Sequence, residues 1–144
     1  MNLKTLNQKL QSLNVLTIAS ETLAEHTGEM ADELRSQLYA GRDNLDQALR
    51  RYRSSEYAQM KHGMNSLPGL GNPDLYLTGA THRSIRMAVN GQMVVTLVTD
   101  IHDLEKRYSH GSINPFLLGS ISKKKLKQTY LQKSSITKVK QHLK

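Results

Sequence analysis

The side chains best suited to metal binding gather in one short segment, where Asp100, His102 and Asp103 stand close to His110. Carboxylate oxygens and imidazole nitrogens are common metal ligands, but a site needs a defined number of them in a defined geometry. The spacing here matches no such pattern. We therefore interpret the segment as a polar loop that follows a strand, and we predict no metal site.

Two other segments have features of phosphate-binding or catalytic sites. Gly69-Leu70-Gly71 is glycine-rich, but it precedes a strand pattern rather than a helix, and no Lys-Ser/Thr pair follows it. His82 stands beside Arg83 and Ser84, yet no Gly-x-Ser-x-Gly elbow and no acid–histidine–nucleophile arrangement can be recognised. The sequence thus predicts a protein that is not an enzyme, with no catalytic residue and no cofactor.

A run of lysines near the C-terminus is the main electrostatic feature. The formal net charge is +8, and eight lysines with no acidic residue lie between Lys123 and Lys144, so the rest of the chain is balanced. This segment is either a solvated basic tail or a surface for DNA phosphates or an acidic neighbouring subunit. If the segment is such a surface, we expect four residues to make the contact, namely Lys123, Lys124, Lys125 and Lys127. Without arginine, base readout is not expected.

The composition limits the size of the core. At 144 residues the chain fits one domain, and 38% hydrophobic and 5% aromatic residues allow only a small aliphatic core. We expect such a lean domain to draw part of its burial from neighbouring chains. There is no Cys and hence no disulfide framework, and we expect neither a signal peptide nor a membrane span.

The N-terminal part has two helical patterns. Leucines spaced three and four residues apart predict an amphipathic helix that begins after Asn2, a favourable N-cap. A second apolar pattern predicts one long helix over residues 15–39, with acidic residues on its outer face and Gly41 as its stop. Gly28 in its middle either marks a close approach to a sheet or is simply tolerated.

The middle of the chain is less regular. We expect a short helix over Asp43–Arg53, and then a helical continuation that includes Tyr57, Met60 and Met64. Three Gly/Pro turn signals close together then predict a loop that ends near residue 73.

The C-terminal part is again helical by pattern. Pro115 suits the first turn of a helix, with Asn114 as its cap, and residues 120–131 are expected to be helical. Residues 134–144 either add a final turn or two or remain a frayed tail.

The clearest local signal is Asn90-Gly91, which separates two apolar-rich runs, Ser84–Val89 and Gln92–Val98. Asn-Gly tolerates the positive φ angles of a type I′ turn, so the pair predicts a two-residue hairpin loop. That turn would create three facing pairs, Val89–Gln92, Met87–Val94 and Ile85–Thr96. One face of the sheet would then carry a shared apolar set, made of Ile85, Met87, Val89, Val94 and Val98.

The second strand is also apolar on its other face, through Met93, Val95 and Leu97. Because the long helix can cover only one face of the sheet, either the C-terminal helix or another subunit must cover the second face. On the second alternative, these three residues form a subunit interface.

Several of these segments resemble one protein family. Asp74-Leu75-Tyr76-Leu77-Thr78-Gly79, followed by Arg83-Ser84-Ile85 and a hairpin, looks like the L-x-x-T-G … S-I segment of the neck and tail-completion proteins of tailed bacteriophages. Asn114-Pro115-Phe116-Leu117 is similar to the P-F step of that family, and Gln37-Leu38-Tyr39-Ala40-Gly41 is similar to its phage and prophage variants. The resemblance covers residues 3–130.

The resemblance implies a structural protein of the head–tail junction, assembled as a ring around the DNA channel. It implies contacts with copies of itself, with other neck, portal-adaptor or tail proteins and, nonspecifically, with packaged DNA, but not with a membrane. The protein would be made in the host cytoplasm and end in the virion. An alternative stays open, a small basic nucleic-acid-binding protein that acts through its lysine-rich C-terminal segment.

We predict an α+β fold, in which a long N-terminal helix packs on a small antiparallel sheet with a central β-hairpin, followed by a helical basic C-terminus. Residues 1–133 would form a single neck-type domain, and residues 134–144 a basic C-terminal tail.

Overall fold

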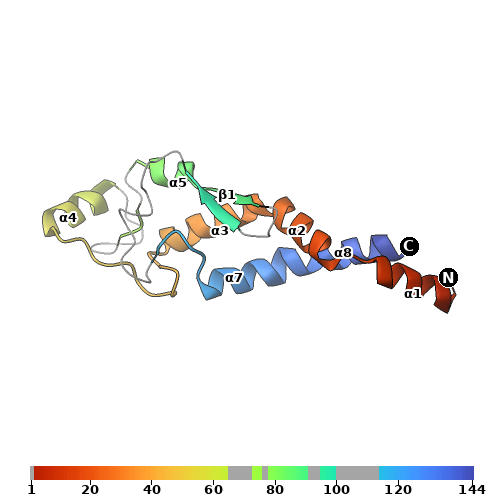
Figure 1. Ribbon diagram of the computed structural model, residues 1–144. Coiled ribbons are helices and arrows are strands. Elements are labelled where there is room, and N and C mark those ends of the chain that lie inside the picture. Colours follow the sequence, from red (N-terminus) through yellow and green to blue (C-terminus); the bar gives the residue numbers. More distant parts are fainter. Residues whose placement is uncertain (1, 65–72, 76–77, 91–94, 100–113) are drawn as a thin grey trace.

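The computed structural model describes residues 2–64, 73–75, 78–90, 95–99 and 114–144, and its fold is α+β, as predicted (Figure 1). The molecule is elongated, with both termini at one end and helix α4 at the other. In chain order the elements are α1 (Leu3–Ser12), α2 (Val15–Glu25), α3 (Thr27–Tyr39), α4 (Ser55–Met64), α5 (Ala80–Ser84), β1 (Arg86–Val89), β2 (Val95–Val98), α7 (Ser120–Leu126), the π-helix η1 (Lys127–Leu131) and α8 (Gln132–Leu143).

Asparagine side chains start the first two helices. Asn2 Oδ1 accepts a hydrogen bond from the backbone N–H of Thr5 at 2.8 Å, as the predicted N-cap should. Asn14 Oδ1 accepts one from the backbone N–H of Thr17 at 3.1 Å. Each side chain satisfies a donor that the first helical turn leaves without a partner.

The expected single helix over residues 15–39 is in fact two helices, α2 and α3. At His26 the backbone leaves the helical conformation (φ −110°, ψ 22°), and the His26 ring lies 3.2 Å from Glu29 Oε1 in the first turn of α3. Gly41 follows the end of α3, as predicted, with a positive φ of 64° that glycine adopts readily. Gly28 is tolerated rather than required, because a Cβ there would meet nothing within 4 Å.

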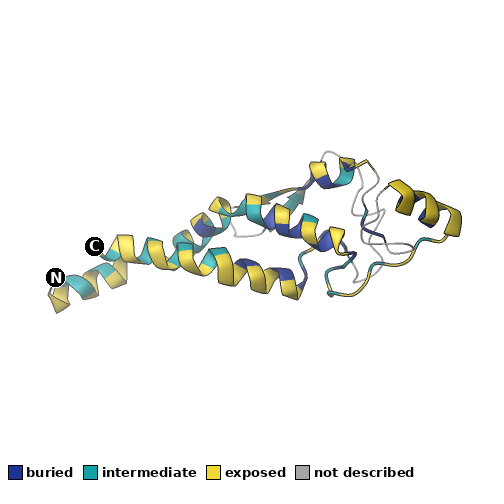
Figure 2. Ribbon diagram, turned by 180° about the vertical axis from the view of Figure 1, so that it is seen from behind, coloured by how far each residue is buried: buried dark blue, intermediate teal, exposed yellow. Residues whose placement is uncertain are grey.

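The core is built on the buried face of α3, which lies between the sheet and α7 (Figures 1 and 2). Five buried apolar residues form the core, namely Ala31, Leu34, Leu38, Ile85 and Phe116. Four partly buried residues pack against them, namely Leu75, Met87, Leu97 and Leu118. With one Phe among aliphatic side chains, this is the small core that the composition predicts.

The hairpin exists, but the predicted register is wrong. β1 and β2 pair antiparallel with Met87 opposite Leu97 and Val89 opposite Val95. The two strands are therefore joined by residues 90–94, not by a two-residue Asn-Gly turn, and Gly91 lies outside the described residues. Ile85 is not a strand residue; it follows α5 and is fully buried.

The register error moves the second strand's side chains to the other face. Residues directly opposite each other share a face, so Met87 and Leu97 point to the same side of the sheet, and both pack against the core. With the predicted turn, Leu97 would have faced away from Met87. The packing of these two large side chains against the core outweighs the local preference of Asn-Gly for a tight turn.

The predicted helix over Asp43–Arg53 is also wrong. This segment is irregular, with one isolated β-bridge between Arg42 and Ala48. Asp43 Oδ1 accepts hydrogen bonds from the backbone N–H groups of Leu45 at 2.8 Å and Gln47 at 3.0 Å. A short acidic side chain that binds nearby backbone donors competes with helix formation in this way. The helical continuation that was predicted through Tyr57, Met60 and Met64 is confirmed as α4.

A short helix, α5, replaces part of the predicted first strand. Gly79 precedes it in the left-handed conformation, with φ 78°. The Arg35 side chain closes its C-terminal end, because Nε donates to the His82 carbonyl at 2.9 Å and Nη2 donates to the Ile85 carbonyl at 2.6 Å. A side chain from α3 thus fixes where α5 ends and β1 begins.

The segment before α7 is clamped to α3 by the fully buried side chain of Gln37. Its Nε2 donates to the Leu117 carbonyl at 2.9 Å, and its Oε1 accepts from the Gly119 N–H at 2.8 Å. Asn114 Oδ1 accepts a hydrogen bond from the Phe116 N–H at 2.9 Å and so caps a turn. No helix begins at Pro115, so the predicted helix start there is wrong.

The helix expected over residues 120–131 is confirmed, and it continues without a break through η1 into α8. The predicted boundary between residues 133 and 134 falls inside α8. Residues 134–143 are therefore not a frayed tail. They form a helix that packs beside α1 and α2, where Lys9 Nζ donates to the Leu143 carbonyl at 3.2 Å.

Candidate functional site: the basic C-terminal helix and its groove

The C-terminal helix, residues 120–143, is positioned at its start by Asp46. Asp46 Oδ2 accepts hydrogen bonds from Ser120 Oγ at 2.5 Å and from the Ile121 N–H at 3.1 Å, so it acts as an N-cap from a distant part of the chain. The hydrogen bond from Ser120 lowers the pKa of the Asp46 carboxyl. The approach needs glycine at position 119, because a Cβ there would lie 2.3 Å from Asp46 Oδ1.

Two lysines attach the helix to the body of the protein. Lys125 Nζ lies 2.5 Å from Glu33 Oε2 on α3. Lys138 Nζ lies 2.6 Å from Glu25 Oε1 and 3.5 Å from Glu21 Oε2 on α2. These hydrogen bonds raise the pKa of both lysines, and the bond from Lys138 lowers the pKa of Glu25. The charges of Lys125 and Lys138 are therefore engaged within the chain.

The other lysines of this helix are exposed, and none of them has an ion pair within the part of the chain that the structure describes. They are Lys123, Lys124, Lys127, Lys133, Lys140 and Lys144, called here the six-lysine surface. Three of the four predicted contact residues belong to it. Lys125 does not, because it is bound to Glu33.

Sequence reasoning missed the second half of this surface. Lys133, Lys140 and Lys144 are seven and four residues apart, which places them on one side of an α-helix. That spacing was readable in the sequence, but it carries meaning only if residues 134–144 are helical. The partners Glu25 and Glu33, by contrast, lie far from the lysines in sequence, and no local signal shows the pairing.

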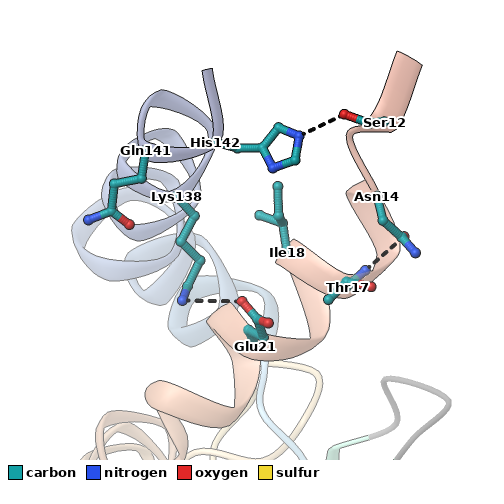
Figure 3. A pocket seen from close by; sticks show the side chains of 8 residues that line it. All are labelled: Ser12, Asn14, Thr17, Ile18, Glu21, Lys138, Gln141 and His142. Atoms are coloured by element: carbon teal, nitrogen blue, oxygen red, sulfur yellow. Dashed lines mark hydrogen bonds and ion pairs between the residues drawn. The ribbon is translucent and has the colours of Figure 1, made fainter. Parts of the chain in front are cut away.

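A groove of about 370 Å³ lies between the C-terminal end of α8 and the junction of α1 with α2 (Figure 3). Ile18 points toward the His142 ring, and the ion pair between Lys138 and Glu21 closes one side. The residues that line it are Ser12, Asn14, Thr17, Ile18, Glu21, Lys138, Gln141 and His142.

Ser12 and His142 meet in this groove. Ser12 Oγ lies 3.2 Å from His142 Nε2, and the same hydroxyl donates to the Lys9 carbonyl at 2.9 Å. A serine hydroxyl has one proton, so Ser12 Oγ can donate to the Lys9 carbonyl or to His142 Nε2 but not to both, and the tautomer of the ring sets which arrangement holds. The contact joins the two ends of the chain.

The predicted subunit interface depended on the face of the sheet on which Val95 and Leu97 lie, and the observed register changes that face. Leu97 packs against the core beside Met87, and Val95 lies opposite Val89 on that same face. The premise that Val95 and Leu97 point away from the body is therefore wrong, because the register differs. Met93 lies outside the described residues.

Two further sequence predictions can be compared with the structure only in part. Asp100, His102, Asp103 and His110 lie outside the described residues, as does Gly69-Leu70-Gly71. Among the residues that are described, no group of three or more His, Asp or Glu side chains is placed to hold a metal ion. In the same residues, no helix is both long and apolar enough to cross a membrane.

Apolar side chains lie uncovered at the end of the molecule that carries the termini. α1 and α8 contain no buried residue. Leu3 is 85% exposed on α1, and Val15 and Leu16 are 64% and 66% exposed at the start of α2. This group of three is called here the apolar tip. A helix with an apolar stripe normally packs that stripe against another element, but these three side chains stay mostly exposed among the described residues, although α1 and α2 contact α8.

One buried polar cluster also escaped prediction. Lys61 on α4 forms an ion pair with Asp74, and both side chains are almost fully buried. The Asp74 carbonyl accepts a hydrogen bond from His82 Nε2 at 2.8 Å. The His82 ring packs against Tyr39, with ring centroids 4.2 Å apart. These residues are scattered in the sequence, and the motifs that contain Asp74 and Tyr39 give no sign of the contacts between them.

Comparisons with the sequence patterns of protein families, with curated proteins and with solved structures found no match to this chain.

Proposed function

We propose that this protein is a non-catalytic structural subunit that assembles with further copies of itself, as a neck or tail-completion component at the head–tail junction of a tailed bacteriophage. The observation that carries the proposal is the apolar tip. The family resemblance of residues 74–79, 83–85 and 114–117 supports the head–tail junction as the place of assembly, and the virion is the proposed location.

The apolar tip supports association because α1, although it contacts α8, gains little stability from burial in a core. α1 has ten residues and buries none of them. Isolated helices shorter than about 12 residues are marginal in water, and most helices in proteins are stabilised by packing of their apolar side. A contact with a second chain over Leu3, Val15 and Leu16 would supply the missing packing.

A second copy is the preferred partner because the small core and the exposed tip occur in every copy of the chain. In a ring, one face of a subunit contacts a different face of the next, so a subunit needs no internal symmetry. Other neck, portal-adaptor or tail proteins would then bind the assembled ring.

The test is a double substitution in the apolar tip, Val15→Asp with Leu16→Asp. Both side chains are mostly exposed, and acidic residues in a first helical turn favour the helix, so the fold should persist. We expect wild-type protein to form large species whose mass rises with concentration in light scattering, and the variant to be a monomer with unchanged circular dichroism.

The matched control is Asn7→Asp with Gln11→Asp, which adds the same charge at exposed polar positions of α1. It should assemble like wild type. A wild-type protein that is monomeric at every concentration contradicts the proposal. Equal loss of assembly in both variants would mean that added charge, not apolar contact, is responsible.

A further inference from the structure

We infer that the six-lysine surface binds the phosphate backbone of duplex DNA. Self-assembly through the apolar tip is a separate property, so either proposal can fail without the other. The six residues are those that remain after Lys125 and Lys138 are paired with glutamates of α2 and α3.

The helix presents these lysines at fixed positions. Its inner side is attached to the body through Lys125 and Lys138, and Ser134 Oγ donates to Glu25 Oε2 at 3.1 Å. The backbone is helical from Ser120 to Leu143 without interruption. At 1.5 Å per residue, Lys123 and Lys144 are about 32 Å apart along the axis. The positive charges are therefore an array spread along and around the helix, not a pocket that closes around one small anion.

Such an array matches a regular polyanion. Duplex DNA carries one negative charge for about each 1.7 Å of its axis, so it offers phosphates along the whole length of the helix. Lysine acts as a point charge toward phosphate, and the helix contains no arginine that could form paired hydrogen bonds with a base edge. The expected binding is therefore insensitive to sequence.

Two observations favour duplex DNA over other polyanions. Single strands bind by stacking of bases on aromatic rings, but Tyr130, the aromatic residue of this helix, is only partly exposed and lies against His26 with ring centroids 5.7 Å apart. An acidic protein would need an apolar centre in the contact. The large apolar side chains exposed on this helix, Ile121 and Ile136, are about 22 Å apart along its axis and form no such centre.

The test is fluorescence anisotropy with a DNA duplex longer than the helix, at several salt concentrations. The variant Lys133→Gln with Lys140→Gln removes two lysines of the six-lysine surface. We expect it to bind about tenfold more weakly at low salt, and the slope of log affinity against log salt to fall by about 1.8, since each phosphate contact contributes about 0.9.

The matched control, Lys125→Gln with Lys138→Gln, changes the net charge by the same amount but removes lysines that are already paired. It should weaken binding less than about twofold. If circular dichroism shows that the double control is unfolded, Lys138→Gln is compared with Lys140→Gln instead.

Equal losses in the two variants would overturn the inference, because net charge alone would then explain binding. Absence of salt-dependent duplex binding by wild-type protein would overturn it too. Tighter binding to a single strand of the same length, or to polyglutamate at the same charge concentration, would assign the surface to a different partner and reject duplex DNA.

Discussion

The body around α3 and the outlying helix α4 are held by different kinds of interaction. In the body, apolar side chains from α3, from residue 85 and from the segment before α7 are packed together, and Gln37 adds two buried hydrogen bonds. α4 projects from one end of the molecule and buries only Ala58 and Lys61 (Figure 2). Among the described residues, the buried ion pair between Lys61 and Asp74 attaches it to the segment before α5.

The difference predicts two modes of failure. Apolar packing is shared among many atoms, so a truncation in the core weakens the whole body by a graded amount. A buried ion pair fails as a unit, because removal of one partner leaves an uncompensated charge in the interior. We therefore expect the body to unfold globally and α4 to detach locally.

The largest expected effect is that of Phe116→Ala. Phe116 is fully buried against Leu34, Leu38 and Ile85, and loss of such a ring typically destabilises a protein by about 3–5 kcal/mol. The control is Leu117→Ala, because Leu117 is the next residue but is exposed, and it should change stability by less than about 1 kcal/mol. Both values come from urea denaturation followed by circular dichroism. Similar losses in the two variants would show that the core does not centre on Phe116.

The second prediction concerns Lys61→Met, which keeps the length of the side chain and leaves Asp74 without its ion pair. Breaking a buried pair typically costs about 3–5 kcal/mol, but here detachment of α4 would return Asp74 to water, so the loss of global stability should stay well below that range. Hydrogen exchange should show loss of protection in residues 55–64 and unchanged protection in α3. An equal loss of protection in both segments would mean that α4 and the body unfold together.

The features that could be predicted from the sequence are those that local residues determine. The Asn2 cap, the stop at Gly41 and the helix from Ser120 all follow from side chains within a few positions of the backbone that they affect. The hairpin register could not be predicted, because it depends on the packing of Leu97 and Met87, which lie opposite each other, against the core. A tertiary contact there overrides a turn preference.

The candidate site shows the same difference between features set by neighbouring residues and features set by distant contacts. The lysine run was found because it is contiguous in sequence, and three of its four predicted contact residues are exposed and lack an ion partner among the described residues. The pairing of Lys125 with Glu33 could not be predicted, because the two residues are 92 positions apart. The capping of α7 by Asp46 could not be predicted for the same reason, because Asp46 and Ser120 are 74 positions apart in the sequence.

The smallest predicted effect concerns His82. Its ring packs against Tyr39 of α3 and binds the carbonyl of Asp74, the residue that forms the ion pair with Lys61 of α4. The Asp74 carbonyl can only accept, so His82 Nε2 carries a proton in that hydrogen bond, in the neutral and in the charged ring alike. Burial lowers the pKa of His82 below its ordinary value of 6.5. The hydrogen bond to the Asp74 carbonyl and the Asp74 charge oppose this shift, and the positive charges of Arg35 and Lys61 add to it. Folding is therefore favoured when this ring is neutral.

The sign of the pH dependence follows from that lowered pKa. Below pH 6.5 the unfolded chain takes up a proton at His82 that the folded protein does not yet bind, so stability is present above 6.5 and is lost as the pH falls through the folded pKa. One proton gives a slope of at most about 1.4 kcal/mol per pH unit. The carboxyls with lowered pKa values, those of Glu25, Glu29 and Asp46, start from 4.5 or 3.8 and act at lower pH.

His82→Gln separates this contribution from the other histidines, because glutamine does not titrate but retains an N–H donor for the Asp74 carbonyl. We expect the variant to be less stable than wild type near pH 8, and the difference to shrink as the pH falls to about 5, in urea denaturation at each pH. A difference that stays constant over this range would show that His82 does not change protonation between the folded and unfolded states. A difference that grows at low pH would mean that the folded protein holds His82 in its charged form, with Asp74 rather than burial dominating its environment.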